Sequence, residues 1–300
     1  MISTGLTAAA IAVLIPAQTA NLTYVDTWTA GAAYPARVAP IPSGGGGGGG
    51  GVLYVTDPPN EAVVEYDATG AVVGTYVIPE GPVGIAVHDD GRVFVSRQDN
   101  QVGVYDATFT LLATVDPTPL AFEGPNDLAF DPGTGELYVV NSEAHQILVF
   151  SETAPGAWTL VRSWGMEGTG MGQLAMPQAI ALDPLLGRVY VADTDNFRVQ
   201  AFDTNGVFQF SFGYRILFTP DKEEAWFARG EGIAVDACGH VYLTDALMGT
   251  LRAFDSTGTE LDSLHLPLVG FGAGPGALRL PADVAIDSGG NVYIANTNNG

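Results

Sequence analysis

Polar side chains with metal-binding chemistry recur where several short apolar segments of this chain begin. The first position after the opening proline, or its equivalent, holds Asn126, Gln178 and Glu231, and the next position holds Asp127 and Asp283. Carboxylate and amide oxygens are the ligands that a hard divalent cation such as Ca²⁺ prefers. Oxygen ligands alone define no unique metal. The alternative, which the sequence favours, is that these groups solvate a wet channel and that no cofactor is required.

A second candidate is residues 213–229, the stretch that departs most from the rest of the chain. It concentrates aromatic residues, both charge signs and the only lysine, Lys222. Long irregular loops often carry function. One interpretation is a surface that binds a partner or ligand, and the other is a flap that packs on the protein's own face. The candidate contact residues are Tyr214, Arg215, Phe218, Trp226 and Arg229.

Other catalytic signatures are missing from the sequence. The eight glycines of 44–51 are not followed by the Lys-Ser/Thr pair that a phosphate-binding loop needs. No serine nucleophile elbow or dinucleotide-binding fingerprint is visible. Cys238 is the only cysteine, so the chain has no internal disulfide, and its role is interpreted as structural.

The candidate residues are positioned by a phrase that the chain repeats six times. Each copy runs apolar, aromatic, apolar and then a small or β-branched residue, as in Val189-Tyr190-Val191-Ala192-Asp193. A period of about 40–50 residues with several short strands is typical of propeller blades. The sequence therefore predicts an all-β, six-bladed propeller of four-stranded antiparallel blades. The aromatic anchors are Tyr54, Phe94, Tyr138, Tyr190, Tyr242 and Tyr293.

One copy shows all four strands of a predicted blade. Residues 177–183, 188–193, 197–203 and 207–212 alternate apolar positions and are separated by turn residues. The first of these strands would line the central channel, so the polar groups at its start are expected to converge at the channel mouth. The Asp or Asn that ends the second strand in most copies is expected to cap the following turn. Arg97, which replaces it once, is expected to form a local salt bridge.

Two segments of the chain, 177–203 and 272–299, resemble the NHL repeat in their Pro-Gln-Ala-Ile-Ala-Leu-Asp and Val-Tyr-Ile-Ala-Asn-Thr-Asn-Asn phrases. The resemblance covers about residues 35–300 and implies a six-bladed β-propeller, but it implies no single activity. Propellers of the gluconolactonase and senescence-marker type hold a divalent metal with Glu, Asn and Asp at the channel.

The resemblance also argues against one activity. Amidating-lyase relatives place a zinc-binding histidine after the opening proline. This chain has no histidine at those positions, which argues against a zinc lyase. The residues found there are Val83, Asn126, Gln178 and Ala282.

The last copy stops after its second strand, so the N-terminus is expected to complete that blade. Residues 10–15 and 22–28 are the candidate third and fourth strands, within a single domain over 1–300 whose segment 1–29 closes the ring. The alternative is a signal peptide at residues 1–20, although no Lys or Arg precedes its apolar run. The glycines of 44–51 are expected to form a loop.

The formal net charge of −22 disfavours nucleic acid and anionic membranes as partners. Acidity and the resemblance together place the protein outside the cytoplasm: extracellular, periplasmic or at the cell surface. The sequence favours a non-catalytic scaffold whose channel-mouth face binds a protein or another macromolecule. The alternative is a metal-dependent hydrolase or lyase of the gluconolactonase and senescence-marker type, with its site at the channel mouth.

Overall fold

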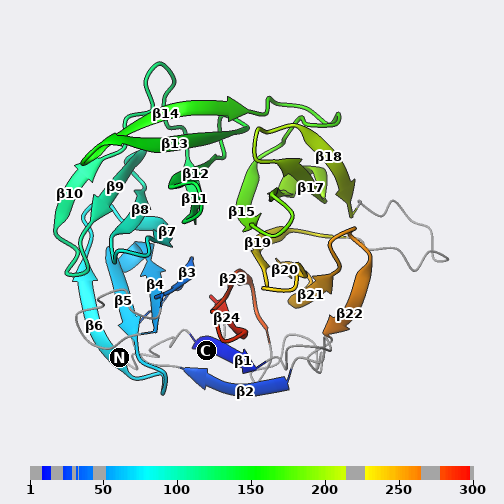
Figure 1. The fold of residues 1–300 in the computed structure, drawn as a ribbon. Coiled ribbons are helices and arrows are strands. Elements are labelled where there is room, and N and C mark those ends of the chain that lie inside the picture. The colour runs from blue at the N-terminus through cyan, green and yellow to red at the C-terminus, as the bar shows by residue number, and fades with distance from the viewer. Residues whose placement is uncertain are drawn as a thin grey trace, which may run out of the picture.

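The protein is an all-β propeller built from four-stranded antiparallel sheets. The structure is a computed structural model that describes residues 9–14, 23–28, 32, 34–42, 52–213, 227–264 and 278–297. Figure 1 looks down the central axis, around which the sheets are arranged as blades. Within the described residues, no helix is both long and apolar enough to cross a membrane.

Five blades are each made of four strands that follow one another in the chain. The first contains β3 (Val38–Pro40), β4 (Leu53–Asp57), β5 (Ala62–Tyr66) and β6 (Val72–Val77). The second contains β7 (Pro82–Val87), β8 (Val93–Arg97), β9 (Gln101–Tyr105) and β10 (Leu111–Thr114). The third contains β11 (Pro125–Asp131), β12 (Glu136–Asn141), β13 (Gln146–Ala154) and β14 (Ala157–Trp164).

The remaining two blades of this kind have the same order from the axis outward. The fourth contains β15 (Pro177–Asp183), β16 (Arg188–Asp193), β17 (Arg198–Asp203) and β18 (Phe208–Phe212). The fifth contains β19 (Gly230–Val235), β20 (Val241–Asp245), β21 (Thr250–Phe254) and β22 (Glu260–Leu264). Two short 3₁₀ turns, η1 (Pro58–Asn60) and η2 (Thr194–Asn196), follow β4 and β16.

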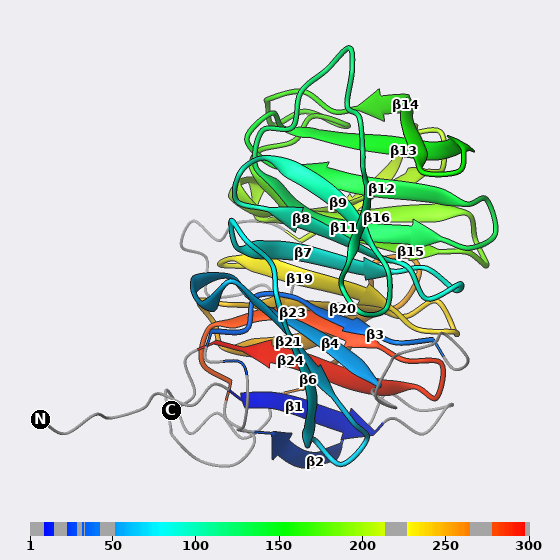
Figure 2. The same ribbon diagram turned by 90° about the vertical axis from the view of Figure 1, so that its left-hand side faces the viewer.

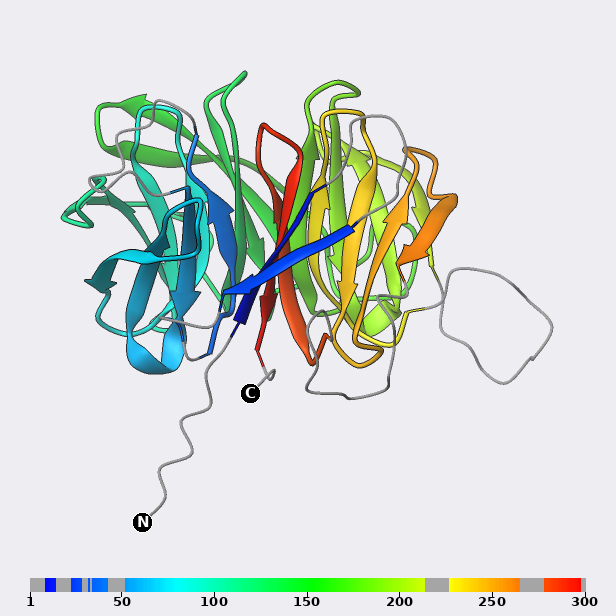
Figure 3. The same ribbon diagram turned by 90° about the horizontal axis from the view of Figure 1, so that it is seen from below.

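A further sheet combines both ends of the chain in the order β2-β1-β24-β23. It contains β1 (Ala9–Leu14), β2 (Thr23–Trp28), β23 (Pro281–Ile286) and β24 (Asn291–Asn296). β1 pairs antiparallel with β24, with Ala10 opposite Ala295, and the side views show the two strands together (Figures 2 and 3). Side chains in this sheet are described for β23 and β24 only. Complete blades therefore number five, with a partial sixth, where six were expected.

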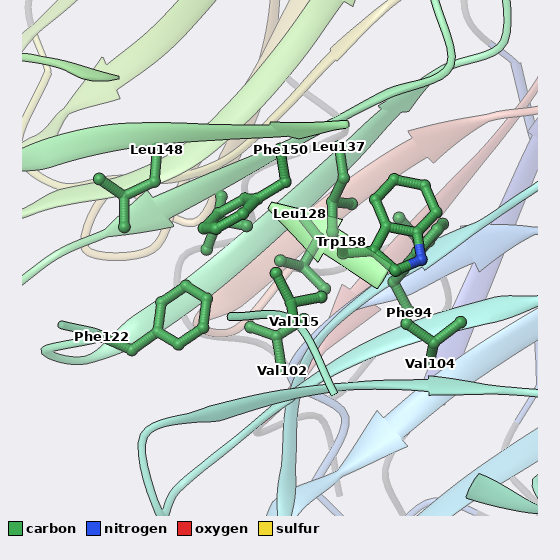
Figure 4. Packing of buried hydrophobic residues seen from close by; sticks show 12 residues of the cluster. Phe94, Val102, Val104, Val115, Phe122, Leu128, Leu137, Leu148, Phe150 and Trp158 are labelled. Atoms are coloured by element: carbon green, nitrogen blue, oxygen red, sulfur yellow. The ribbon is translucent and has the colours of Figure 1, made fainter. Parts of the chain in front are cut away.

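The core lies between neighbouring blades and includes aromatic side chains from both sides. Phe94 of β8 packs edge-on against Trp158 of β14, with ring centroids 4.9 Å apart, and both are at most 1% exposed. Figure 4 shows the surrounding aliphatic side chains of the second and third blades, including Leu128 and Val102. A blade cannot bury this surface alone, so the ring of blades supplies its stability.

The turn cap predicted at the end of the second strands is confirmed for Asp245, whereas Asn141 and Asp193 accept backbone hydrogen bonds from another segment. Asn141 accepts a hydrogen bond from the N–H of Glu123, and Asp193 accepts one from the N–H of Ala175 at 2.7 Å. Both donors lie on the connection that enters the same blade, rather than on the following turn. Asp245 binds both its entering connection and its own turn. The salt bridge predicted for Arg97 is confirmed, with Asp99 at 2.8 Å.

Candidate functional site

The centre of the propeller is crossed by the side chain of Arg37, which immediately precedes β3 and is 4% exposed. Its Nη1 donates hydrogen bonds to the carbonyl oxygens of Glu231 at 3.0 Å and Ala282 at 2.8 Å. Its Nη2 donates to the carbonyl oxygen of Gln178 at 2.7 Å. One guanidinium therefore joins the first strands of three other blades, β15, β19 and β23.

Two buried carboxylates face the same guanidinium. Oδ1 of Asp127 lies 3.7 Å from Nε of Arg37, and Oδ1 of Asp283 lies 3.6 Å from its Nη1. The second oxygen of each accepts a backbone hydrogen bond from the next blade, Asp127 from Ile180 and Asp283 from Val38, both at 2.9 Å. Asp127 and Asp283 thus connect neighbouring blades as well as balancing the charge of Arg37.

Burial controls the ionisation of this group. It raises the pKa of Asp283 to about 8, with a further rise from Asp127 and an opposing effect of Arg37. Burial also raises the pKa of Asp127, against the effect of Arg37. Burial disfavours the charged guanidinium, but Asp127, Asp283 and Glu231 outweigh it and raise the pKa of Arg37. Two carboxylates facing one cation in a dry interior do not both ionise readily.

Two cavities lie along the channel. The inner one, of about 280 Å³, is lined by β3, β7, β11, β15, β19 and β23, and most of its lining is apolar apart from Asp127 and Asp283. The second, of about 340 Å³, lies at the start of β11 and β15 and is lined by charged and amide side chains. We call the second one the mouth cavity; its polar lining includes Arg97, Gln98, Asn100, Asn126, Glu143 and Gln178.

The five predicted metal ligands are divided among three places. Asn126 and Gln178 line the mouth cavity, where Nδ2 of Asn126 donates a hydrogen bond to Oε1 of Gln178. Asp127 and Asp283 line the inner cavity. The carboxylate of Glu231 forms an ion pair with Arg229. The side chains from blades three and four therefore meet at the mouth as expected, but the five residues do not converge on one point.

The divalent cation implied by the gluconolactonase resemblance does not fit the axis of this channel. A cation held by Asp127 and Asp283 would lie beside the buried guanidinium of Arg37, which already contacts both carboxylates. Two positive charges in a medium of low dielectric repel strongly. Sequence reasoning assigned no role to Arg37. The signal was its place in the repeat, since it occupies the position that holds Asp127 and Asp283 in other copies.

Most of the predicted partner surface lies outside the described residues. The residues concerned are Tyr214, Arg215, Phe218 and Trp226. The predicted glycine loop of 44–51 also lies outside the described residues. Arg229 is described, and its side chain is 53% exposed beside Glu231.

Comparison with known proteins identifies similar chains. Residues 48–276 match the model of the family described as SMP-30/Gluconolactonase/LRE-like region. A solved gluconolactonase from Xanthomonas campestris has a TM-score of 0.62 at 17% identity, over 88% of this chain and 86% of that one. At this identity the likeness shows the fold alone.

Curated relatives match shorter stretches. NHL repeat-containing protein 3 of Mus musculus is 35% identical over 88 residues, which are 28% of this chain and 24% of the relative. Peptidylglycine alpha-amidating monooxygenase of Rattus norvegicus is 35% identical over 86 residues, 27% of this chain and 8% of the relative. The chain thus matches under a quarter of the length of either. NHL proteins are distant relatives, and the family that matches most of the chain is a different one from the family predicted.

Proposed function

The chain belongs to the SMP-30/gluconolactonase/LRE-like family, and from this premise we propose that it is a hydrolase acting on a small polar substrate in the mouth cavity. The family match supports this alternative better than the non-catalytic scaffold that the sequence favoured. The observation that carries the proposal is the mouth cavity itself. Its volume of about 340 Å³ lies in the range of small-molecule sites, about 300–1,000 Å³.

The lining of the mouth cavity suits a substrate rich in hydroxyl groups. Asn100, Asn126 and Gln178 offer amide donors and acceptors. Arg97 supplies a positive charge that Asp99 orients at 2.8 Å, and Glu143 supplies a carboxylate. In ester or lactone hydrolysis, Glu143 would accept a proton from the attacking water, and Arg97 would stabilise the negative charge that develops on the carbonyl oxygen.

The test is a hydrolysis assay on a panel of sugar lactones and simple esters, in which the acid released by hydrolysis is measured. Glu143→Gln is expected to lower kcat by about 10²–10⁴-fold, which is the usual contribution of a general base. Glu123→Gln is the matched control, because Glu123 is an exposed glutamate on the preceding connection that does not line the mouth cavity. Equal activity of wild type and Glu143→Gln on every cleaved substrate would exclude this role for Glu143.

Metal dependence is tested on the same preparation. Because Arg37 occupies the axis, no step is assigned here to a divalent cation. We expect chelator-treated protein to keep its activity on a cleaved lactone, and Ca²⁺ to leave kcat unchanged. Activity lost with chelator and restored by Ca²⁺ would overturn this part of the proposal and return Asn126 and Gln178 to the role of metal ligands.

We also propose that the ring closes as six blades, with β1 and β2 completing the sheet of β23 and β24. The antiparallel register of β1 with β24, from Ala9 opposite Asn296 to Leu14 opposite Asn291, supports this closure. Closure of this kind removes the exposed edge that β24 would otherwise present.

A further inference from the structure

Three residues with different metal-binding atoms lie together on the turn between β19 and β20. The ligand atoms of Asp236, Cys238 and His240 all lie within 4.8 Å of one another. Because β19 begins at the mouth with Gly230 and ends at Val235, this turn lies at the opposite end of the channel from the mouth cavity. The cluster therefore has no part in the proposed hydrolytic site.

The carboxylate of Asp236 organises the turn. Oδ1 of Asp236 accepts hydrogen bonds from the N–H groups of Cys238 at 2.8 Å and His240 at 2.9 Å. Its Oδ2 lies 2.9 Å from Nδ1 of His240 and 3.1 Å from the hydroxyl of Tyr242.

The turn between β23 and β24 is a matched comparison within the same chain. Oδ1 of Asp287 accepts from Gly289 at 2.9 Å and Asn291 at 2.8 Å. Its Oδ2 accepts from Nδ2 of Asn291 at 2.8 Å and from the hydroxyl of Tyr293 at 3.0 Å. The same turn thus forms with glycine at the position of Cys238 and asparagine at that of His240, so neither the thiol nor the imidazole is required for folding.

A second, independent observation comes from the neighbouring blade. Asp183, at the end of β15, is 1% exposed. Its Oδ1 accepts from the N–H groups of Leu185 and Leu186 at 3.0 and 3.1 Å, whereas its buried Oδ2 has no hydrogen-bond partner among the described residues. This oxygen lies 3.4 Å from the place that a Cβ on Gly239 would occupy. The unpartnered oxygen of Asp183 thus lies near Gly239, the residue between Cys238 and His240.

An unpartnered buried carboxylate oxygen is costly, and a cation on the adjacent turn would offset that cost. We propose that Asp236, Cys238 and His240 bind a divalent transition-metal ion of the zinc class, with Asp183 as a further negative charge facing the site. Mixed sulfur, nitrogen and oxygen donors suit Zn²⁺ or Co²⁺ rather than Ca²⁺ or Mg²⁺. Cys238 binds as the thiolate, so its proton is released to solvent on binding.

The number of ligands also indicates the kind of site. Three protein ligands, one of them on the exposed Cys238, leave a coordination position for water, as in open zinc sites. Asp236, Asp183 and the thiolate together carry more negative charge than one divalent ion neutralises. The site therefore favours divalent over monovalent ions, on a protein whose net charge of −22 already attracts cations.

The experiment is titration of the full chain with Zn²⁺ and Co²⁺ alone. We expect one Zn²⁺ per chain by calorimetry, and a Co²⁺ complex whose near-ultraviolet spectrum contains a thiolate-to-metal charge-transfer band. Cys238→Gly and His240→Asn copy the β23–β24 turn and so should keep the fold, which circular dichroism checks. Each is expected to weaken Zn²⁺ binding by at least about tenfold. Loss of a residue that only supports a metal ligand lowers metal affinity by about 10–100-fold, and loss of a ligand itself should cost no less. Asp183→Asn is expected to fall in that about 10–100-fold range.

Two results would overturn the proposal. One is a wild-type protein that binds no stoichiometric Zn²⁺ and shows no thiolate band with Co²⁺, a result that requires no variant. The other is binding that is lost in Cys238→Gly but unchanged in His240→Asn, which would reduce the site to a single exposed thiol. Failure here leaves the hydrolase proposal intact, because that proposal is tested separately through Glu143.

Discussion

At the scale of single residues, Arg37 is the feature on which the centre of the molecule depends. It contacts three backbone carbonyls and two carboxylates from other blades. A buried charge is tolerated only when it is paired and hydrogen-bonded, and here Asp127 and Asp283 meet that requirement. Asp127 and Asp283, which were candidate metal ligands, occupy the same position of the repeat as Arg37 in the first copy. This position thus supplies both the carboxylates and the positive charge that they face.

We expect Arg37→Met to destabilise the fold by about 3–5 kcal/mol, the usual cost of leaving a buried partner charge unpaired. Urea unfolding measures the change. Arg229→Met is the control, because Arg229 is about half exposed and exposed ion pairs contribute about 0–1 kcal/mol. Adding Asp127→Asn and Asp283→Asn to Arg37→Met should recover part of the loss. No difference between Arg37→Met and Arg229→Met would contradict this account of the centre.

The raised pKa of Asp283 makes a separate prediction about pH. The folded pKa, about 8, exceeds the unfolded value of about 3.9, so the folded state binds the proton more tightly. The stability that this group contributes is therefore complete below about pH 4 and is lost as pH rises toward 8. Asp283→Asn should flatten this decline between about pH 5 and pH 8, as measured by the free energy of unfolding at each pH. An unchanged slope would show that Asp283 does not titrate there.

At the scale of elements, the Asp or Asn that ends the second strand of four sheets binds the connection that enters the same sheet. Asp193 is the clearest example, since it is fully buried and binds the N–H of Ala175 as well as Arg198 and Gln200 of β17. The side chain thus joins three segments of one blade. This explains why Asp or Asn recurs at the position, although the partner differs from the one predicted.

Asp193→Ala is expected to destabilise the protein by roughly 3 kcal/mol or more, because Arg198 and Gln200 lose a buried charged acceptor. Asp195→Ala, two residues further on at an exposed position, should change stability by less than about 0.5 kcal/mol. Thermal or urea unfolding of both variants tests the difference. Similar losses for the two would show that the buried network around Asp193 contributes little.

At the scale of the whole molecule, the joining of the two chain ends determines whether the ring is closed. In the variant Cys238→Ser, paired cysteines at Ala10 and Ala295, which lie opposite each other, should form a disulfide under mild oxidation. Mass spectrometry of the intact and reduced protein detects it. Ala10→Cys with Ala253→Cys, a buried position in the fifth blade, should give none. Failure of the Ala10–Ala295 pair to cross-link would contradict closure by β1.

How much the sequence reveals differs between the strands and the site. The alternation of apolar residues, the recurring aromatic anchors and the turn residues are features of a few neighbouring residues. The strands predicted over 177–183 and 188–193 are therefore confirmed. The candidate site depends on groups far apart in the chain. Asn126 and Gln178 were correctly expected near each other, because their places in the repeat are equivalent. Glu231 has an equivalent place too, but its neighbour Arg229 pairs with it.

By itself, the sequence determined that this protein is an all-β repeat of propeller blades, because blade formation is a local matter of period and turn chemistry. Only the tertiary structure decided what occupies the channel. Val38 and Asp283, which are joined by a hydrogen bond, lie 245 positions apart in the chain, and Arg37 beside Val38 contacts the same carboxylate. No local sequence pattern predicts contacts between residues so far apart. The same holds for Asp183 and the turn at Gly239, which belong to different blades. The meeting of these charged groups is set by the arrangement of the blades relative to one another, which the order of residues within one blade does not contain.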